Sequence, residues 1–150
     1  MDKFTGRVWV LGDDIDTDII IPTEYLALKT IDDMKQYGFS PLRPELAGQI
    51  QKGDIIVAGK NFGCGSSREQ APEIIKAMGV QCVIAKSFAR IFFRNSINNG
   101  LLLIEQPDLY DDMKEGDEIT VVMNEHVDYN GKEYPIASLL ENLMSIIQAG

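Results

Sequence analysis

The sequence contains only two cysteines and one histidine among its 150 residues. Cys64 and Cys82 are too few to build a framework of disulfides, which suits a reducing compartment. No apolar run approaches the roughly 20 residues that span a bilayer, and the polar start from Met1 to Gly6 lacks a signal pattern. We therefore expect a cytoplasmic protein without a membrane partner.

Basic residues are also scarce. The chain has 14 Lys and Arg against 23 Asp and Glu, a formal net charge of −9. This balance disfavours nucleic acid as a partner. The same charge repels anionic substrates at long range, although salt screens this repulsion beyond about 8–10 Å. An anion site must therefore rely on local donors. The length and the hydrophobic content of 45% predict one domain, residues 1–150, with a proper core.

The order of apolar patterns predicts an α/β fold. Between residues 54 and 105 strands and helices alternate as βαβαβ, which indicates a parallel core in a mixed sheet. Prolines and glycines interrupt any long helix between the first strand and residue 54, and Asn130-Gly131 is a strong hairpin turn. The predicted elements are strands at 7–11, 54–59, 82–86, 101–105 and 118–123, a hairpin around 128–135, and helices near 68–78, 88–98 and 137–148.

The run NFGCGSSREQAP, from Asn61 to Pro72, is the richest in chemistry. A glycine-rich turn leads from a strand into a helix, where free backbone N–H groups and the helix dipole hold a carboxylate or phosphate. Arg68 adds a bidentate partner for a carboxylate. Donors of this kind stabilise an alkoxide, so Ser66 is a candidate base. Equally, Ser66 or Ser67 fits a capping box that only satisfies the first N–H groups of the helix.

Other readings of this turn fit less well. A dinucleotide-binding loop needs glycine where Arg68 stands, and the Gly-Lys-Ser/Thr of a P-loop is absent. Cys64 at a helix start has the setting of a lowered pKa and a nucleophilic thiol, but its possible partner His126 lies far away in a polar, turn-rich stretch. A Cys-His nucleophile is therefore the weaker hypothesis.

Three blocks resemble the small subunit of the aconitase-type hydro-lyases, with 3-isopropylmalate dehydratase the nearest member. They are GDDIDTDIIIP (12–22), the segment 59–72, and KSFARIFFRNSINNGLLLI (86–104). The resemblance implies a swivelling β/β/α domain of the aconitase small-subunit type. It also implies that Ser66 is the catalytic base, that Arg68 binds a substrate carboxylate, and that Ser67 is a neighbouring polar contact. Many relatives have histidine where this chain has Gln70, so no role is assigned to that side chain.

The resemblance further implies a four-iron four-sulfur cluster, one iron of which is the Lewis acid for the departing hydroxyl. Such clusters are held by cysteine thiolates, and two cysteines are too few. The family places the cluster on a large catalytic subunit. We therefore expect no cofactor on this chain, a large iron-sulfur subunit as its partner, and an inactive chain in isolation.

The acidic run that begins at Asp13 raises the question of a metal. A calcium loop that starts at Asp14 needs glycine and glutamate where Ile19 and Tyr25 stand, and we expect no metal site in this chain. Aspartates in such a run commonly shape a turn. By resemblance, Thr17 and Asp18 match a Thr-Asp pair of the family's active site and are assigned to substrate binding.

The segment YLALKT forms the expected specificity loop, because in the family this loop faces the variable substituent of the substrate. Relatives that accept an extra carboxylate, such as homoaconitase, have an arginine after Tyr-Leu, whereas this chain has two apolar residues. An unpaired polar group costs on the order of 1–3 kcal/mol, so homocitrate is disfavoured. Lys29 could turn inward and supply a charge, although a solvated lysine is the simpler reading. The loop consists of Tyr25, Leu26, Ala27, Leu28, Lys29 and Thr30.

These expectations combine into a small subunit that helps isomerise 2-isopropylmalate and 3-isopropylmalate by dehydration and rehydration, a step of leucine biosynthesis. The apolar loop leaves 2,3-dimethylmalate and citramalate open as substrates, and homoaconitate remains a further alternative. A function of another class is also open, namely a non-catalytic domain that binds small anions while Ser66 only caps the helix.

Overall fold

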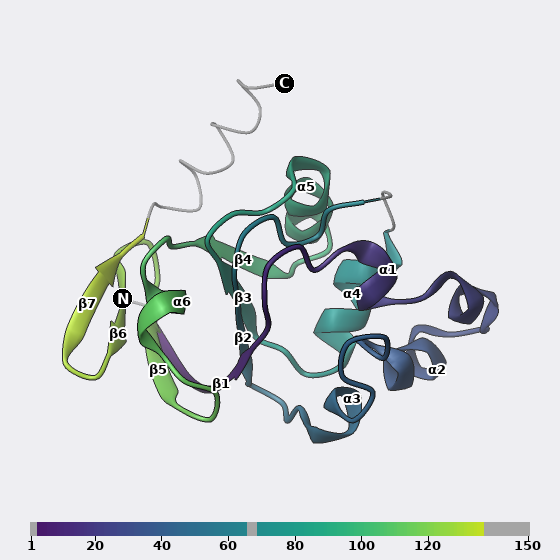
Figure 1. Cartoon of the computed structure of the whole chain (residues 1–150), viewed down its shortest axis with the longest axis horizontal. Helices are drawn as coiled ribbons and strands as arrows, with labels where there is room; N and C mark the ends of the chain where they lie inside the picture. Colours follow the sequence, from purple (N-terminus) through teal and green to yellow (C-terminus); the bar gives the residue numbers. More distant parts are fainter. Residues whose placement is uncertain (1–2, 66–68, 137–150) are drawn as a thin grey trace.

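The computed structural model describes residues 3–65 and 69–136 (Figure 1). A seven-stranded sheet in the order β4-β3-β2-β1-β5-β6-β7 runs through this part of the chain. Its first half is parallel and its second half antiparallel. The strands are β1 (Lys3–Val10), β2 (Ile55–Ala58), β3 (Cys82–Ala85), β4 (Leu102–Glu105), β5 (Glu118–Val122), β6 (His126–Tyr129) and β7 (Lys132–Pro135).

Two regular helices connect the parallel strands. Helix α4 (Gln70–Ala77) follows β2, and α5 (Arg90–Asn98) follows β3. Ala71, Ile74 and Ile75 of α4 are fully buried, as the helical period of the apolar residues requires. The other helices are one-turn segments: α1 (Thr17–Ile20), α2 (Ile31–Met34), α3 (Leu46–Gln49) and α6 (Leu109–Asp112), with 3-10 turns η1 (Thr23–Ala27) and η2 (Lys35–Tyr37).

The central strands separate two hydrophobic clusters. Ile56 and Ala58 point to the face covered by α1 to α5, whereas Ile55 and Val57 point to the opposite face, which contains Leu109 of α6. Successive side chains of a strand point to opposite faces, so a strand buried on both must be apolar throughout. Cluster residues from β5, β6 and β7 also belong to the second face, because the sheet curls around it.

The structure confirms the mixed α/β class and the βαβαβ core. Strand β1 is longer than predicted, beginning at Lys3, because its first half pairs antiparallel with β5. The hairpin turn is confirmed at Asn130 and Gly131, whose φ angles are 53° and 82°. The predicted tail helix at 137–148 lies outside the described residues. None of the described helices is long and apolar enough to cross a membrane.

Candidate functional site

Loops that leave the carboxyl ends of β1, β2 and β3 meet at one edge of the sheet (Figure 1). In open α/β sheets this edge is the usual place for a ligand. The loops are 11–16, 59–65 and 86–89. They contain the first residues of the three sequence blocks singled out above, so the starts of blocks separated by dozens of residues become neighbours.

Backbone hydrogen bonds join the first loop to the second. The Gly63 N–H donates to the Ile15 carbonyl at 2.7 Å, and the Asp14 N–H donates to Lys60 at 2.8 Å. The Thr17 N–H donates to the Cys64 carbonyl at 2.9 Å. These bonds pair the two segments over several residues, so the loops form one unit.

The acidic run supplies the side chains of this unit. Asp13 accepts from the Lys60 N–H at 2.7 Å, and Asp14 accepts from the Asn61 amide at 3.1 Å. Asp16 caps α1 by accepting from the Ile19 N–H at 2.8 Å. The interpretation of these aspartates as turn-forming residues is therefore confirmed.

The third loop supports the second from the other side. The Phe62 N–H donates to the Ser87 carbonyl at 3.0 Å, and the Ala89 N–H donates to Phe62 at 2.9 Å. The Asn61 N–H donates to the Ser87 hydroxyl at 2.8 Å. Sequence reasoning assigned no role to Ser87 or Asn61. In the sequence these two residues stand out only as members of the blocks, because the hydrogen bond between them depends on the fold.

Ser66, Ser67 and Arg68 lie outside the described residues. The described chain stops at Gly65, beyond the carboxyl end of β2, and resumes at Glu69. Helix α4 then begins at Gln70, with Glu69 as the N-cap residue and no capping bond from its side chain.

Thr17 lies beside Gly65, and Asp18 follows it in α1. A Cβ placed on Gly65 would lie 3.5 Å from the Thr17 hydroxyl, so Thr17 packs directly beside the glycine. Thr17 is only 2% exposed, whereas Asp18 is exposed. The pair therefore combines a buried threonine with a carboxylate open to solvent.

The predicted specificity loop follows α1 through η1. Tyr25 stacks on Tyr37 with ring centroids 3.9 Å apart. Leu26 and Leu28 are half-buried against the core. Ala27, Lys29 and Thr30 are exposed, and Thr30 caps α2 by accepting from the Asp33 N–H at 3.1 Å.

The two cysteines have different surroundings, and both disfavour the thiolate. Cys82 is fully buried in β3, which raises its pKa strongly. Burial raises the pKa of Cys64 as well, and the charges of Asp16 and Asp14 add to this effect. His126 lies on β6, separated from β2 by β5 and β1. The Cys-His nucleophile is therefore wrong.

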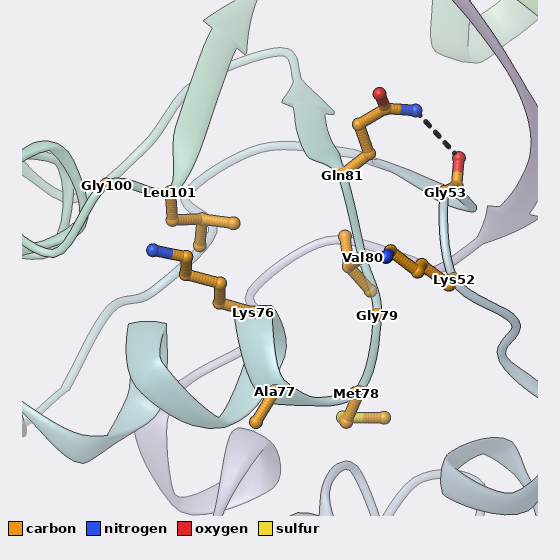
Figure 2. Close-up of a pocket in the computed structure, with 10 residues that line it drawn as sticks. All are labelled: Lys52, Gly53, Lys76, Ala77, Met78, Gly79, Val80, Gln81, Gly100 and Leu101. Carbon is orange, nitrogen blue, oxygen red and sulfur yellow. Dashed lines mark hydrogen bonds between the residues drawn. The ribbon is translucent and has the colours of Figure 1, made fainter.

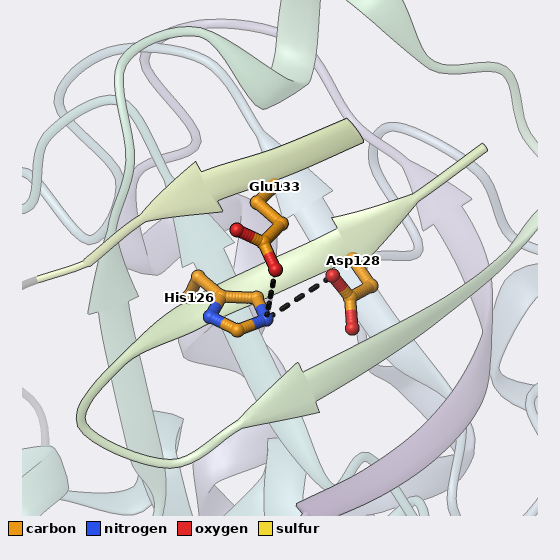
Figure 3. Close-up of side chains that lie close together, drawn as sticks. All are labelled: His126, Asp128 and Glu133. Carbon is orange, nitrogen blue, oxygen red and sulfur yellow. Dashed lines mark ion pairs between the residues drawn. The ribbon is translucent and has the colours of Figure 1, made fainter. Parts of the chain in front are cut away.

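Two other features lie away from this edge. A pocket of about 530 Å³ opens at the amino ends of the parallel strands, where Gln81 donates to the Gly53 carbonyl at 3.0 Å (Figure 2). The second feature is a cluster of His126 with two carboxylates on β6 and β7 (Figure 3). Neither shares a residue with the three loops. The pocket is lined by Lys52, Gly53, Lys76, Ala77, Met78, Gly79, Val80, Gln81, Gly100 and Leu101.

Comparison with known proteins gives consistent matches. Residues 18–109 match the aconitase C-terminal domain family. The 3-isopropylmalate dehydratase small subunit of Lachnospira eligens is 76% identical over 99% of this chain and 91% of its own length. Small subunit 1 of Archaeoglobus fulgidus is 50% identical over 97% of this chain and 91% of its own length. The crystal structure of 3-isopropylmalate dehydratase (LeuD) from Methanocaldococcus jannaschii superimposes with a TM-score of 0.85 at 36% identity, covering 99% of this chain and 98% of that one.

Proposed function

Because this chain belongs to the aconitase C-terminal domain family, we propose that it is the small subunit of a 3-isopropylmalate dehydratase. The observation that carries the proposal is the 76% identity to a protein of that name over nearly the whole chain. The family resemblance inferred from the three blocks is thereby confirmed, as is the aconitase small-subunit fold. The proposed reaction interconverts 2-isopropylmalate and 3-isopropylmalate. In it the chain acts as one swivel domain together with a partner subunit.

Ser66 is the proposed base. In this reaction an alkoxide removes a proton from carbon, the electrons of that C–H bond form a double bond, and the hydroxyl leaves the adjacent carbon with its bonding pair and takes a proton from solvent to become water. Water then adds back with the positions of hydrogen and hydroxyl exchanged. The first turn of α4 supports this role, because N–H groups at a helix start stabilise an oxyanion and so lower the proton affinity of the serine oxygen.

Arg68, Ser67 and Asp18 are the proposed substrate contacts. A guanidinium binds a carboxylate through two parallel hydrogen bonds, which positions the substrate as well as attracting it. Asp18 is exposed at the same edge and can accept from a substrate hydroxyl. Thr17 is buried beside Gly65, so we assign it to holding the turn in place.

The cysteines of this chain do not fit an iron-sulfur cluster. Cys82 is sealed in the core and the surroundings of Cys64 disfavour its thiolate, whereas cluster irons require thiolate ligands. We therefore place the four-iron four-sulfur cluster on a large subunit, where it supplies the Lewis acid for the departing hydroxyl. The small-subunit names of the relatives support such a heteromer.

The specificity loop supports an apolar substituent. Leu26 and Leu28 are half-buried with their side chains against the core, and Ala27 is small. An additional carboxylate would meet no partner in this apolar stretch unless Lys29 turned toward it, and Lys29 is exposed to solvent. We therefore propose an isopropyl group as the preferred substituent, with 2,3-dimethylmalate and citramalate as competitors and homocitrate as a poor substrate.

The test is reconstitution with a 3-isopropylmalate dehydratase large subunit under anaerobic conditions. Formation of the unsaturated product is followed by absorbance with 3-isopropylmalate, citramalate, 2,3-dimethylmalate and homocitrate. We expect Ser66→Ala to lower kcat by about 10²–10⁴-fold, as for loss of a general base, while the subunits still assemble. Thr120→Val removes a hydroxyl on β5, which lies outside the three loops, and should leave activity unchanged.

Three outcomes would contradict parts of the proposal. Full activity of Ser66→Ala would favour the anion-binding function, in which the serine only caps the helix. Appreciable turnover of homocitrate would overturn the reading of Ala27 and Leu28. Activity of the chain without its partner would overturn the placement of the cluster.

A further inference from the structure

Three potential metal ligands converge on the outer face of the β6–β7 hairpin (Figure 3). The Nε2 atom of His126 lies 3.1 Å from an Asp128 oxygen and 3.4 Å from a Glu133 oxygen. One ligand atom from each residue lies within 4.8 Å of the others. We call these residues the His126 cluster.

The backbone sets this geometry. Asp128 and Glu133 are directly paired across the antiparallel strands, so both side chains leave the same face of the hairpin. His126 precedes Asp128 by two residues and shares that face. The tight turn at Asn130 and Gly131 holds the register of the two strands. The cluster is therefore built into the hairpin and does not rely on long, flexible side chains meeting by chance.

The electrostatics of the His126 cluster favour a cation between the ligands. Two carboxylate oxygens approach the Nε2 atom of one imidazole, and this nitrogen offers a lone pair to a metal ion when the ring proton is on Nδ1. The side chains of His126, Asp128 and Glu133 are 21%, 46% and 70% exposed, so an ion can enter from solvent and keep bound water.

Two of the three separations between ligand atoms match a transition metal. Zinc binds histidine nitrogen and carboxylate oxygen at about 2.0–2.2 Å, which separates neighbouring ligand atoms by roughly 3.0–3.6 Å in tetrahedral or octahedral geometry. The two separations from Nε2 lie in this range. One imidazole with two carboxylates favours zinc or a similar transition ion over magnesium and calcium, which prefer oxygen alone.

We propose that the His126 cluster binds one divalent transition-metal ion of the zinc class and thereby clamps β6 to β7. From the sequence alone we expect no metal site, because these ligands lie on two strands and lack a familiar spacing. The cluster also falls outside the residues that match the family, 18–109. It is independent of the hydro-lyase function and would remain if that function were wrong.

The test uses the full-length chain, freed of metal by a chelator that is then removed. Titration with zinc chloride near neutral pH is followed by calorimetry, and thermal unfolding is measured with and without zinc. We expect one ion to bind and the melting temperature to rise, because a ligand of the folded state stabilises it. Magnesium and calcium at the same concentration should give no comparable shift.

Variants separate this site from other ligands. His126→Ala and the double variant Asp128→Asn/Glu133→Gln should each weaken zinc binding by about tenfold or more, an effect at least as large as the loss of an outer-shell partner. Glu24→Gln/Asp32→Asn removes two exposed carboxylates elsewhere and is the matched control. Cobalt spectra identify thiolate ligation by strong near-ultraviolet bands, so they reveal whether Cys64 takes the ion instead.

Several results would overturn the proposal. One is the absence of saturable zinc binding. Another is binding that survives His126→Ala, or a cobalt complex with thiolate bands. A third is a melting temperature that zinc does not change. Circular dichroism of each variant shows whether the fold is intact.

Discussion

At the scale of single residues, Cys64 shows how the surroundings set reactivity. Its thiol stands at the glycine-rich turn, where a helix start would lower its pKa. Burial raises the pKa instead, and the charges of Asp16 and Asp14 act in the same direction. The two carboxylates lie near the thiol because the first loop is hydrogen-bonded to the second. The thiol is therefore protonated at neutral pH and poorly nucleophilic.

This gives a prediction for alkylation of Cys64 by iodoacetamide. The rate at neutral pH should be well below that of a small-molecule thiol and should rise as the pH rises. Asp14→Asn removes one negative charge while keeping an oxygen that accepts from Asn61, so it should lower the thiol pKa and speed the reaction a few-fold. Asp32→Asn, on α2, is the control. Rapid alkylation of the unmodified chain at neutral pH would contradict the prediction.

At the scale of elements, the second loop is fitted against α5. Gly63 has a φ of +84°, and a Cβ at this position would lie 2.1 Å from the ring of Phe92. The rings of Phe62 and Phe92 meet edge to face with centroids 5.5 Å apart. The glycine therefore lets the loop approach the helix closely, which brings Cys64 and Gly65 beside α1.

Gly63→Ala should accordingly destabilise the fold strongly. The left-handed backbone costs about 1–2 kcal/mol for alanine, and overpacking against Phe92 adds about 1–3 kcal/mol. Gly116→Ala is the matched control, since Gly116 has a φ of +93° with open space around it, so it should lose only the backbone contribution. Urea unfolding measures both. Equal losses in the two variants would show that the close approach is unimportant.

At the scale of the whole molecule, carboxylates with lowered pKa values tie the chain together. The Arg43 guanidinium lowers the pKa of Glu115. The Tyr134 hydroxyl donates to Asp112 at 2.7 Å and the Tyr129 hydroxyl donates to Asp117 at 2.6 Å. These bonds lower the pKa of each aspartate. Each contact joins segments distant in sequence, so protonation of the acids weakens the assembly of the sheet.

The pH dependence of stability follows from the direction of these shifts. A carboxyl whose pKa is lower in the folded state stabilises the fold above its unfolded pKa of about 4, and this contribution is lost as the pH falls through the folded value. Tyr129→Phe/Tyr134→Phe should lower the free energy of unfolding at neutral pH and make it fall less between about pH 5 and 2. Tyr37→Phe is the control. An unchanged acid limb in the double variant would contradict the assignment.

Much of the fold could be predicted from local patterns. The apolar period of α4, the continuous apolar runs of β2 and β3, and the Asn130-Gly131 turn are set by neighbouring residues. The one-turn helices between β1 and β2 could not be predicted, because they are too short for a period and form only where they pack on the core. The extension of β1 to Lys3 needed β5, which is more than a hundred residues away.

The sequence by itself determined the type of each main element and the chemistry of the family's motif, because both depend on residues close together in the chain. Only the tertiary structure decided which residues meet: the three loops at the carboxyl edge, Thr17 beside Gly65, and the His126 cluster across β6 and β7. The physical reason is that strand order and register bring distant segments into contact. Those quantities result from packing of the whole sheet and are not encoded in any short stretch of residues.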